Sequence, residues 1–509
     1  MSRHKQQMNG PKRGLAFIGV AALLFALVGV GWAHFDHRLP SNATLLHSGS
    51  EVTVGLDSQA PQSLDIRTVR GKELDQALIG NVYETLVGRD QNNKLVPSIA
   101  KSWDVSKDGL NYTFTLNSDM RFANGDALDS TDVVYSLQQI LNKNYAGAED
   151  LTGLKSVKNP DVSTVQIALS APNPRLLRAL SSRAGIIYDS TSSVNYTRQS
   201  GGSGPFTVHS FNPGNSIVLS RNPLYWKQQS ATSQITLRYF DSVETLNKAM
   251  QSGEIQLAVL RPTDSPKSFE DNKKYTVSKG LTTSKVTLAL NSSADALFSD
   301  EHTRWAVRYI LDNTAITRDQ PNAATVLNGP ISPLEPGYDD LSALYPHNLS
   351  EGENDINYYK RQYVGDNTFL VPQEYESLGQ EVVKQFAPTN FHLVMQVVDD
   401  NTLNQRIANG DYSMAIVTMQ GPDDLGAFAN GRFGYQNSQA QQDYRNALAS
   451  PNDIDYQRNL RAYAKTVSAD AGSAWFYTES SMVVADTNVT GYPKNMTDEF
   501  LPLRDVRTK

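Results

Sequence analysis

The sequence contains no cysteine among its 509 residues. This absence excludes disulfide bonds, thiolate metal sites and a cysteine nucleophile together. It also removes the residue to which a bacterial lipoprotein attaches its lipid, so any membrane tether must be polypeptide.

Histidine is scarce, with eight residues in the chain. Three of them fall within residues 34–50, where His34 and His37 could hold a metal ion at helical spacing, although a solvated stretch explains them more simply. The other five form no H-x-x-H or H-E-x-x-H pair. We therefore expect no metal site and no cofactor.

A recognisable catalytic set is also missing. Residues 98–101 (SIAK) match the S-x-x-K pattern of penicillin-recognising enzymes, but the partner motifs S-D-N and K-T-G are absent, and no G-x-S-x-G occurs. The glycine-rich residues 201–204 lead toward an expected strand and match neither common phosphate-binding motif. Adjacent acids, as at 339–340 and 399–400, are typical of solvated turns. We therefore expect a binding protein rather than an enzyme.

The longest apolar run lies near the N-terminus. Residues 14–33 contain no charged side chain and follow the basic segment 1–13. Twenty helical residues span about 30 Å, the thickness of a bilayer core, and basic residues before the run place the N-terminus in the cytoplasm. The run is either a signal peptide, with Gly31 and Ala33 at the cleavage site, or a membrane anchor, which its length favours. Residues 34–50 then form a linker, and the rest of the chain is exported in either case.

The exported part is acidic. Residues 1–33 hold four basic and no acidic side chains, so the remainder has a formal net charge of −11. This balance argues against nucleic acid and anionic lipid as partners.

The length predicts two or three domains, and the periodicity predicts interleaved strands and helices, hence an α/β fold. Strands are expected at residues 51–57, 112–116, 162–169, 206–211, 216–219, 233–240 and 285–290. Helices are expected within 81–99, from about 130, and at 243–251, 303–312, 403–409 and 454–468.

The clearest local pattern occupies residues 102–137. Alternation over residues 112–116 predicts a strand after the turn at Lys107-Asp108-Gly109. A second turn at 124–126 precedes Asp129-Ser130-Thr131-Asp132, which predicts a helix start with acidic groups in its first turn.

The order of motifs resembles the family 5 solute-binding proteins of bacterial ABC importers, the group that includes oligopeptide, dipeptide and nickel binders. The similarity lies in five segments, at residues 81–103 (NVYETLVGRDQNNKLVPSIAKSW), 108–136, 203–226 (SGPFTVHSFNPGNSIVLSRNPLYW), 288–313 and 400–416. Together they cover most of residues 51–491 in family order.

The resemblance implies a two-lobed clamp of the periplasmic-binding-protein type with an inserted subdomain (class C), in which ligand is trapped by hinge closure. Lobe I would comprise residues 51–80, 195–285 and 486–509, and lobe II residues 286–485. The insert would comprise residues 81–194.

The resemblance also implies where ligand binds, with one departure. Peptide-binding members carry G-W and then an Asp that pairs with the α-amino group of the peptide, but here the corresponding residues 418–424 lack the Gly-Trp pair and have Pro422 at the Asp position. Either Asp423 or Asp424 takes that role, or the ligand lacks a free amino terminus. The expected ligand-binding residues are Gln59, Ala60, Pro61, Met419, Gln420, Gly421, Asp423, Asp424 and Tyr477.

The resulting expectation is a monomeric extracytoplasmic binding protein that captures a peptide or other small solute and delivers it to ABC permease subunits in the membrane. The alternative is a membrane-anchored receptor that uses the same clamp for sensing without transport. An exported hydrolase is disfavoured by the missing catalytic set.

Overall fold

The computed structural model describes residues 50–344, 346–359, 367–497 and 500–509, without the side chains of residues 422 and 423. The predicted basic segment 1–13, the apolar segment 14–33 and almost all of the predicted linker lie outside the described residues. Within the described part of the chain, no helix is long and apolar enough to cross a membrane.

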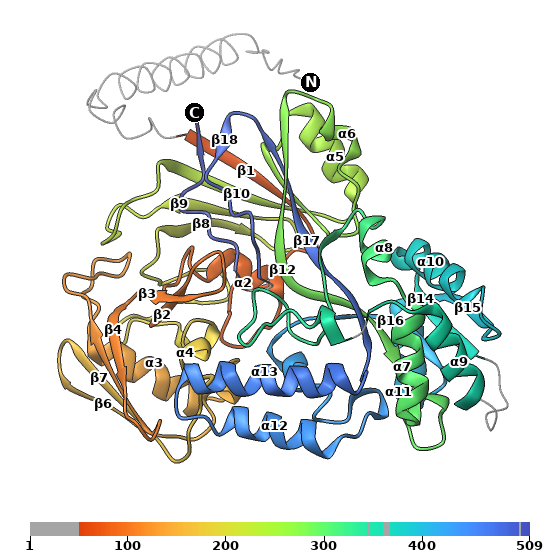
Figure 1. Cartoon of the computed structure of the whole chain (residues 1–509). Coiled ribbons are helices and arrows are strands. Elements are labelled where there is room, and N and C mark those ends of the chain that lie inside the picture. The colour runs from red at the N-terminus through yellow and green to blue at the C-terminus, as the bar shows by residue number, and fades with distance from the viewer. Residues whose placement is uncertain (1–49, 345, 360–366, 498–499) are drawn as a thin grey trace, which may run out of the picture. The chain divides into compact units, whose positions relative to one another are not determined.

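A mixed sheet of eleven strands forms the centre of residues 50–509 (Figure 1). Its order is β15-β14-β16-β12-β17-β11-β1-β10-β9-β8, with β13 also paired to β17. In chain order the strands are β1 (Ser50–Asp57), β8 (Phe206–Asn212), β9 (Ser216–Arg221), β10 (Thr232–Phe240), β11 (Leu257–Leu260), β12 (Tyr275–Leu290), β13 (Ala323–Val326), β14 (Asn367–Pro372), β15 (Leu393–Val398), β16 (Met414–Met419) and β17 (Ala474–Asp486).

Two long antiparallel strands, β12 and β17, connect the two sides of this sheet. The end of β17, from Met482 to Ala485, pairs with β11, which is parallel to β1. The end of β12, from Lys285 to Leu290, pairs with β16, which is parallel to β14. All of β17 except its last residue is buried, as expected for a strand covered on both faces.

Helices alternate with the strands along the chain, which confirms the predicted α/β class. Outside residues 81–194 they are α2 (Lys72–Leu78), α5 (Val243–Ser252), α6 (Lys267–Glu270), α7 (Glu301–Ile310), α8 (Asn313–Arg318), α9 (Leu349–Tyr359), α10 (Glu376–Phe386), α11 (Asp400–Asn409), α12 (Ser438–Leu448) and α13 (Asp453–Ala469). The predicted helices at 243–251, 303–312, 403–409 and 454–468 are therefore confirmed to within a few residues.

A second, four-stranded sheet contains the predicted strand of residues 112–116. Its order is β4 (Ala100–Val105), β5 (Asn111–Leu116), β7 (Thr164–Leu169) and β6 (Leu154–Asp161). It packs with α3 (Ser130–Asn142) and α4 (Leu176–Ala179) around a separate apolar core that runs from Leu86 to Ile187.

The predicted start of α3 is also confirmed. The Asp129 carboxylate accepts the Thr131 N–H at 2.7 Å, and the Asp132 carboxylate accepts the Asp129 N–H at 3.0 Å. This reciprocal capping box satisfies backbone donors that the first helical turn leaves open.

The helix predicted within residues 81–99 is wrong. That segment holds two short paired strands, β2 (Val87–Arg89) and β3 (Leu95–Pro97). The Leu86 N–H donates to the Gly185 carbonyl at 2.8 Å, so hydrogen bonds to a distant segment replace a helical ladder. Near the C-terminus, β18 (Val489–Thr490) pairs with β19 (Arg507–Thr508).

Candidate functional site

A cavity of about 1350 Å³ lies where β12 and β17 cross between the two sides of the large sheet. One wall comes from the ends of β1 and β11 and from α2, and the other from α11, β16 and the segment around Tyr375. Its charged lining residues are Asp57, Lys72, Arg261, Asp264, Glu374, Asp400, Arg432 and Glu479. Five acidic side chains thus face three basic ones, so the cavity favours cationic groups.

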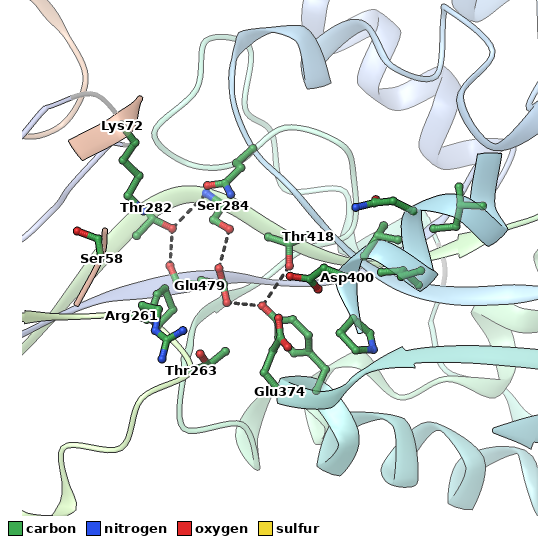
Figure 2. Close-up of a pocket in the computed structure, with 18 of the residues that line it drawn as sticks. Ser58, Lys72, Arg261, Thr263, Thr282, Ser284, Glu374, Asp400, Thr418 and Glu479 are labelled. Carbon is green, nitrogen blue, oxygen red and sulfur yellow. Dashed lines mark hydrogen bonds between the residues drawn. The ribbon is translucent and has the colours of Figure 1, made fainter. Parts of the chain in front are cut away.

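An irregularity in the β12–β17 pairing shapes the floor of the cavity. Leu281 pairs with Ser480 and Lys285 pairs with Thr478, so three residues of β12 stand opposite the single residue Glu479. Such a bulge bends a strand and redirects its side chains. Here it brings the hydroxyls of Thr282 and Ser284 to Glu479 (Figure 2).

The Glu479 carboxylate is the centre of a polar network and is 5% exposed. One oxygen accepts the Ser284 hydroxyl at 2.6 Å, and the other accepts the Tyr375 hydroxyl at 2.6 Å and the Asn322 amide at 3.3 Å. The Thr418 hydroxyl from β16 in turn donates to the Tyr375 oxygen at 3.1 Å. The connecting strands β12 and β17 and the neighbouring strand β16 therefore contribute to one network across the floor.

Tyr375 is held in its neutral form within this network. Burial and then the neighbouring Glu479 carboxylate raise the pKa of its hydroxyl well above the ordinary value. A neutral hydroxyl remains a hydrogen-bond donor, so Tyr375 orients the carboxylate rather than repelling it.

A second acidic group lies at the ends of β1 and β11. The Arg261 guanidinium donates to Asp57 at 2.9 Å and contacts Asp264 at 3.5 Å. Burial, and then the hydrogen bond and charge of Asp57, raise the pKa of Asp264 to about 7. One guanidinium thus contacts two buried carboxylates at this edge of the cavity.

Three of the predicted ligand residues directly follow the cavity wall in the chain without lining it. Gln59 is exposed, and Ala60 and Pro61 are partly buried, whereas the cavity is lined by Asp57 and Ser58 just before them.

The ligand residues predicted between Met419 and Asp424 differ in whether they line the cavity. Gln420 lines the cavity, whereas Met419 is fully buried in an apolar core and Gly421 lies at the start of a short turn of helix with φ +95°. Asp424 is 7% exposed and pairs with Arg432 at 2.8 Å. The side chain of Asp423 lies outside the part of the chain that the structure describes.

Tyr477, the remaining predicted residue, is fully buried on β17. Its ring belongs to an apolar core, and its hydroxyl donates to the Asn322 side chain at 3.3 Å. It lies two residues before Glu479, which does line the cavity.

The residues that sequence reasoning missed are Glu479, Tyr375, Arg261 and Asp264. Glu479 lies two residues after the aromatic run 475–477, and an acid in the middle of a buried strand was the available signal. Arg261 and Asp264 lie in a segment with no recognisable motif.

Among the described residues, no group of three His, Cys, Asp or Glu side chains could hold a metal ion.

Comparison with known proteins identifies a family. The model of the bacterial extracellular solute-binding proteins, family 5 (middle), matches residues 94–439. A probable D,D-dipeptide-binding periplasmic protein of Escherichia coli is 22% identical over 424 residues, which are 78% of this chain and 82% of that protein. The nickel-binding periplasmic protein of Escherichia coli is 27% identical over 247 residues, 46% of this chain and 47% of that protein.

Solved structures show the same fold. The ABC transporter substrate-binding protein CtaP of Listeria monocytogenes has a TM-score of 0.80 at 18% identity, covering 90% of this chain and 99% of that one. DppA of Helicobacter pylori, solved in complex with the peptide STSA, has a TM-score of 0.69 at 18% identity, covering 90% of this chain and 98% of that one. The predicted periplasmic-binding-protein-like fold is therefore confirmed.

Proposed function

The chain belongs to the family 5 bacterial extracellular solute-binding proteins, and from this premise we propose that it captures a peptide or peptide-like solute and delivers it to an ABC permease. The chain is thus a binding protein and not an enzyme. We propose that residues 14–33 either tether it to the extracytoplasmic face of the membrane or are cleaved after export.

The observation that carries the proposal is the cavity itself. At about 1350 Å³ it exceeds the roughly 300–1,000 Å³ of sites for drug-sized ligands, so it has room for an oligopeptide. Its lining is rich in hydroxyl, amide and carboxylate groups, such as Thr282, Thr418 and Gln420, which can hydrogen-bond a peptide main chain. The names of the D,D-dipeptide-binding and peptide-complexed relatives support the same ligand class.

We propose that capture involves closure of two lobes, with residues 51–80, 195–285 and 486–509 in one and 286–485 in the other, and with 81–194 as an insert. The long strands β12 and β17 run through the connection between the two sides of the sheet (Figure 1). Ligand shifts the population toward the closed form only by its better contacts in that form. A network that joins Thr418 of β16 to Glu479 of β17 provides such contacts on the floor.

Of the ligand residues predicted from sequence, we propose Gln420 as a direct contact. Asp424 is already neutralised by Arg432, so we assign it to holding the segment after β16. Gln59, Ala60 and Pro61 would reach ligand only if closure brings their loop inward.

Titration calorimetry of the full-length chain with pools of di- to octapeptides tests the proposal. We expect at least one pool to bind, with affinity reduced in Gln420→Ala and unchanged in Gln436→Ala, a nearby residue that does not line the cavity. Failure of every pool to bind would refute the peptide assignment. If the chain binds peptides but a strain that lacks its gene takes up peptides as well as the parent strain does, the receptor alternative is favoured.

A further inference from the structure

We infer that Glu479 is the receptor for a primary ammonium group on the ligand. The inference rests on the proposed function, because it concerns the same cavity, and it narrows the ligand class to solutes with a free amine. It also names an anchor outside the segment 418–424 from which an amine-binding acid was expected.

Among the residues that the structure describes, Glu479 has no cation of its own. Its donors are the neutral groups of Ser284, Tyr375 and Asn322, and no ion pair joins it to a described Lys, Arg or His. The neighbouring Lys285 does not neutralise it, since its ammonium is fully buried and lies 2.8 Å from Glu335.

The other buried carboxylates in and beside the cavity, in contrast, each contact an arginine. Asp57 and Asp264 share Arg261, and Asp424 beside the cavity holds Arg432. Glu374 and Asp400 line the cavity but are exposed, so water already screens them. Within the described residues, Glu479 is thus the buried cavity carboxylate whose counter-charge is missing. A buried charge is costly until it is paired.

The hydrogen bonds that Glu479 already accepts favour an ammonium over a guanidinium as the missing cation. A planar guanidinium binds a carboxylate best through both oxygens at once. One Glu479 oxygen already accepts both the Tyr375 hydroxyl and the Asn322 amide, and the other accepts the Ser284 hydroxyl, which leaves one lone pair on a single oxygen. A compact ammonium needs one such position and can donate its remaining protons to hydroxyl oxygens.

Those hydroxyl oxygens stand around the carboxylate. The Thr282 hydroxyl donates to the Glu479 carbonyl and accepts the Ser284 N–H at 3.1 Å, which leaves its oxygen one lone pair. The Thr418 hydroxyl donates to Tyr375, and its oxygen can still accept a hydrogen bond. Figure 2 shows Thr282, Ser284 and Thr418 grouped around Glu479. The geometry therefore offers one charged and several neutral acceptors within a small space, which suits the three protons of an ammonium.

The test compares the full-length wild-type chain with Glu479→Gln and with Glu374→Gln, a matched control that removes an exposed carboxylate from the same cavity. The probes for calorimetry are a pool of tri- and tetrapeptides with free amino termini, the same pool after N-acetylation, and a set of simple primary amines (putrescine, cadaverine and glucosamine).

We expect the wild type to bind the free-amine pool about 10- to 100-fold more tightly than the acetylated pool, the range of one charge-assisted contact. Glu479→Gln should abolish this preference and keep the wild-type unfolding midpoint, while Glu374→Gln retains the preference. A preference that survives in Glu479→Gln, or a wild type that binds both pools equally, would overturn the inference.

Two further outcomes are decisive. If no peptide of either pool binds, only the proposal of a peptide ligand fails, and the simple amines test the role of Glu479. Binding of an amine to wild type that is lost in Glu479→Gln supports the inference. Absence of amine binding to wild type overturns it. If Glu479→Gln does not fold, Glu479→Asp, which withdraws the carboxylate by one methylene, must lose the amine preference, and its retention overturns the inference.

Discussion

The pair of carboxylates around Arg261 makes the stability of this protein depend on pH. Burial and the adjacent Asp57 raise the pKa of Asp264 to about 7. The pKa of an aspartate in an unfolded chain is about 4. The perturbation we propose is Asp264→Asn, which keeps the shape of the side chain and removes its proton equilibrium.

The sign follows from proton binding. Between about pH 4 and pH 7 the folded state keeps the Asp264 proton and the unfolded state releases it, so the free energy of unfolding of the wild type falls as pH rises. This stabilising contribution is complete below the unfolded pKa and is lost as pH rises through the folded pKa.

The magnitude is bounded by the shift. Each pH unit within the window changes the free energy of unfolding by at most about 1.4 kcal/mol, so three units give an upper limit of about 4 kcal/mol. The Arg261 side chain is 57% exposed, and water therefore reaches one side of the cluster. We expect a change of about 2–3 kcal/mol after this screening.

Urea unfolding of the full-length chain at pH 4.5, 6.0 and 7.5 measures the effect. The difference between wild type and Asp264→Asn reports the titration of Asp264 together with its interaction with Asp57, because groups outside this pair titrate in both proteins. We expect the difference to shift by about 2–3 kcal/mol in favour of the variant as pH rises. The exposed control Asp295→Asn should show no shift, and a constant difference between wild type and Asp264→Asn across the range would refute the reasoning.

Three further predictions concern stability, each checked by urea unfolding at neutral pH. Lys285→Met should lower the free energy of unfolding by about 3–5 kcal/mol, because Glu335 is left as a buried unpaired charge; adding Glu335→Gln should restore part of the loss, and full additivity would contradict the pairing. Asp129→Ala should cost about 1 kcal/mol through loss of the α3 cap, so an unchanged stability would contradict the capping role. Gly202→Ala should cost more than about 3 kcal/mol, since a Cβ there would lie 2.0 Å from the Val82 carbonyl oxygen; a neutral result would show that this backbone can move.

The framework could be predicted from sequence because its signals are local. The alternation at residues 112–116 and the cap at Asp129 each depend on neighbours within a few residues, and both are confirmed. The helix prediction for residues 81–99 was wrong for the opposite reason. Its backbone bonds to residues such as Gly185, about a hundred positions away, and tertiary contacts of this kind override local preference.

The candidate site was harder to predict because it is assembled from distant segments. Glu479 meets Ser284, Asn322 and Tyr375 across 195, 157 and 104 residues of chain. The bulge that turns these side chains toward one another is a property of strand register, and a single strand does not encode its register alone. Family resemblance indicated the segment 418–424, and of that segment Thr418 and Gln420 line the cavity.

The most direct test of solute capture is mass spectrometry of the purified full-length chain under native conditions, followed by identification of what denaturation releases. We predict a one-to-one complex with a peptide or peptide-like solute that bears a primary amine and dissociates more readily from the Glu479→Gln variant. A released solute that is neither peptide-like nor an amine would contradict it, as would a chain that carries no solute and acquires none from a peptide mixture.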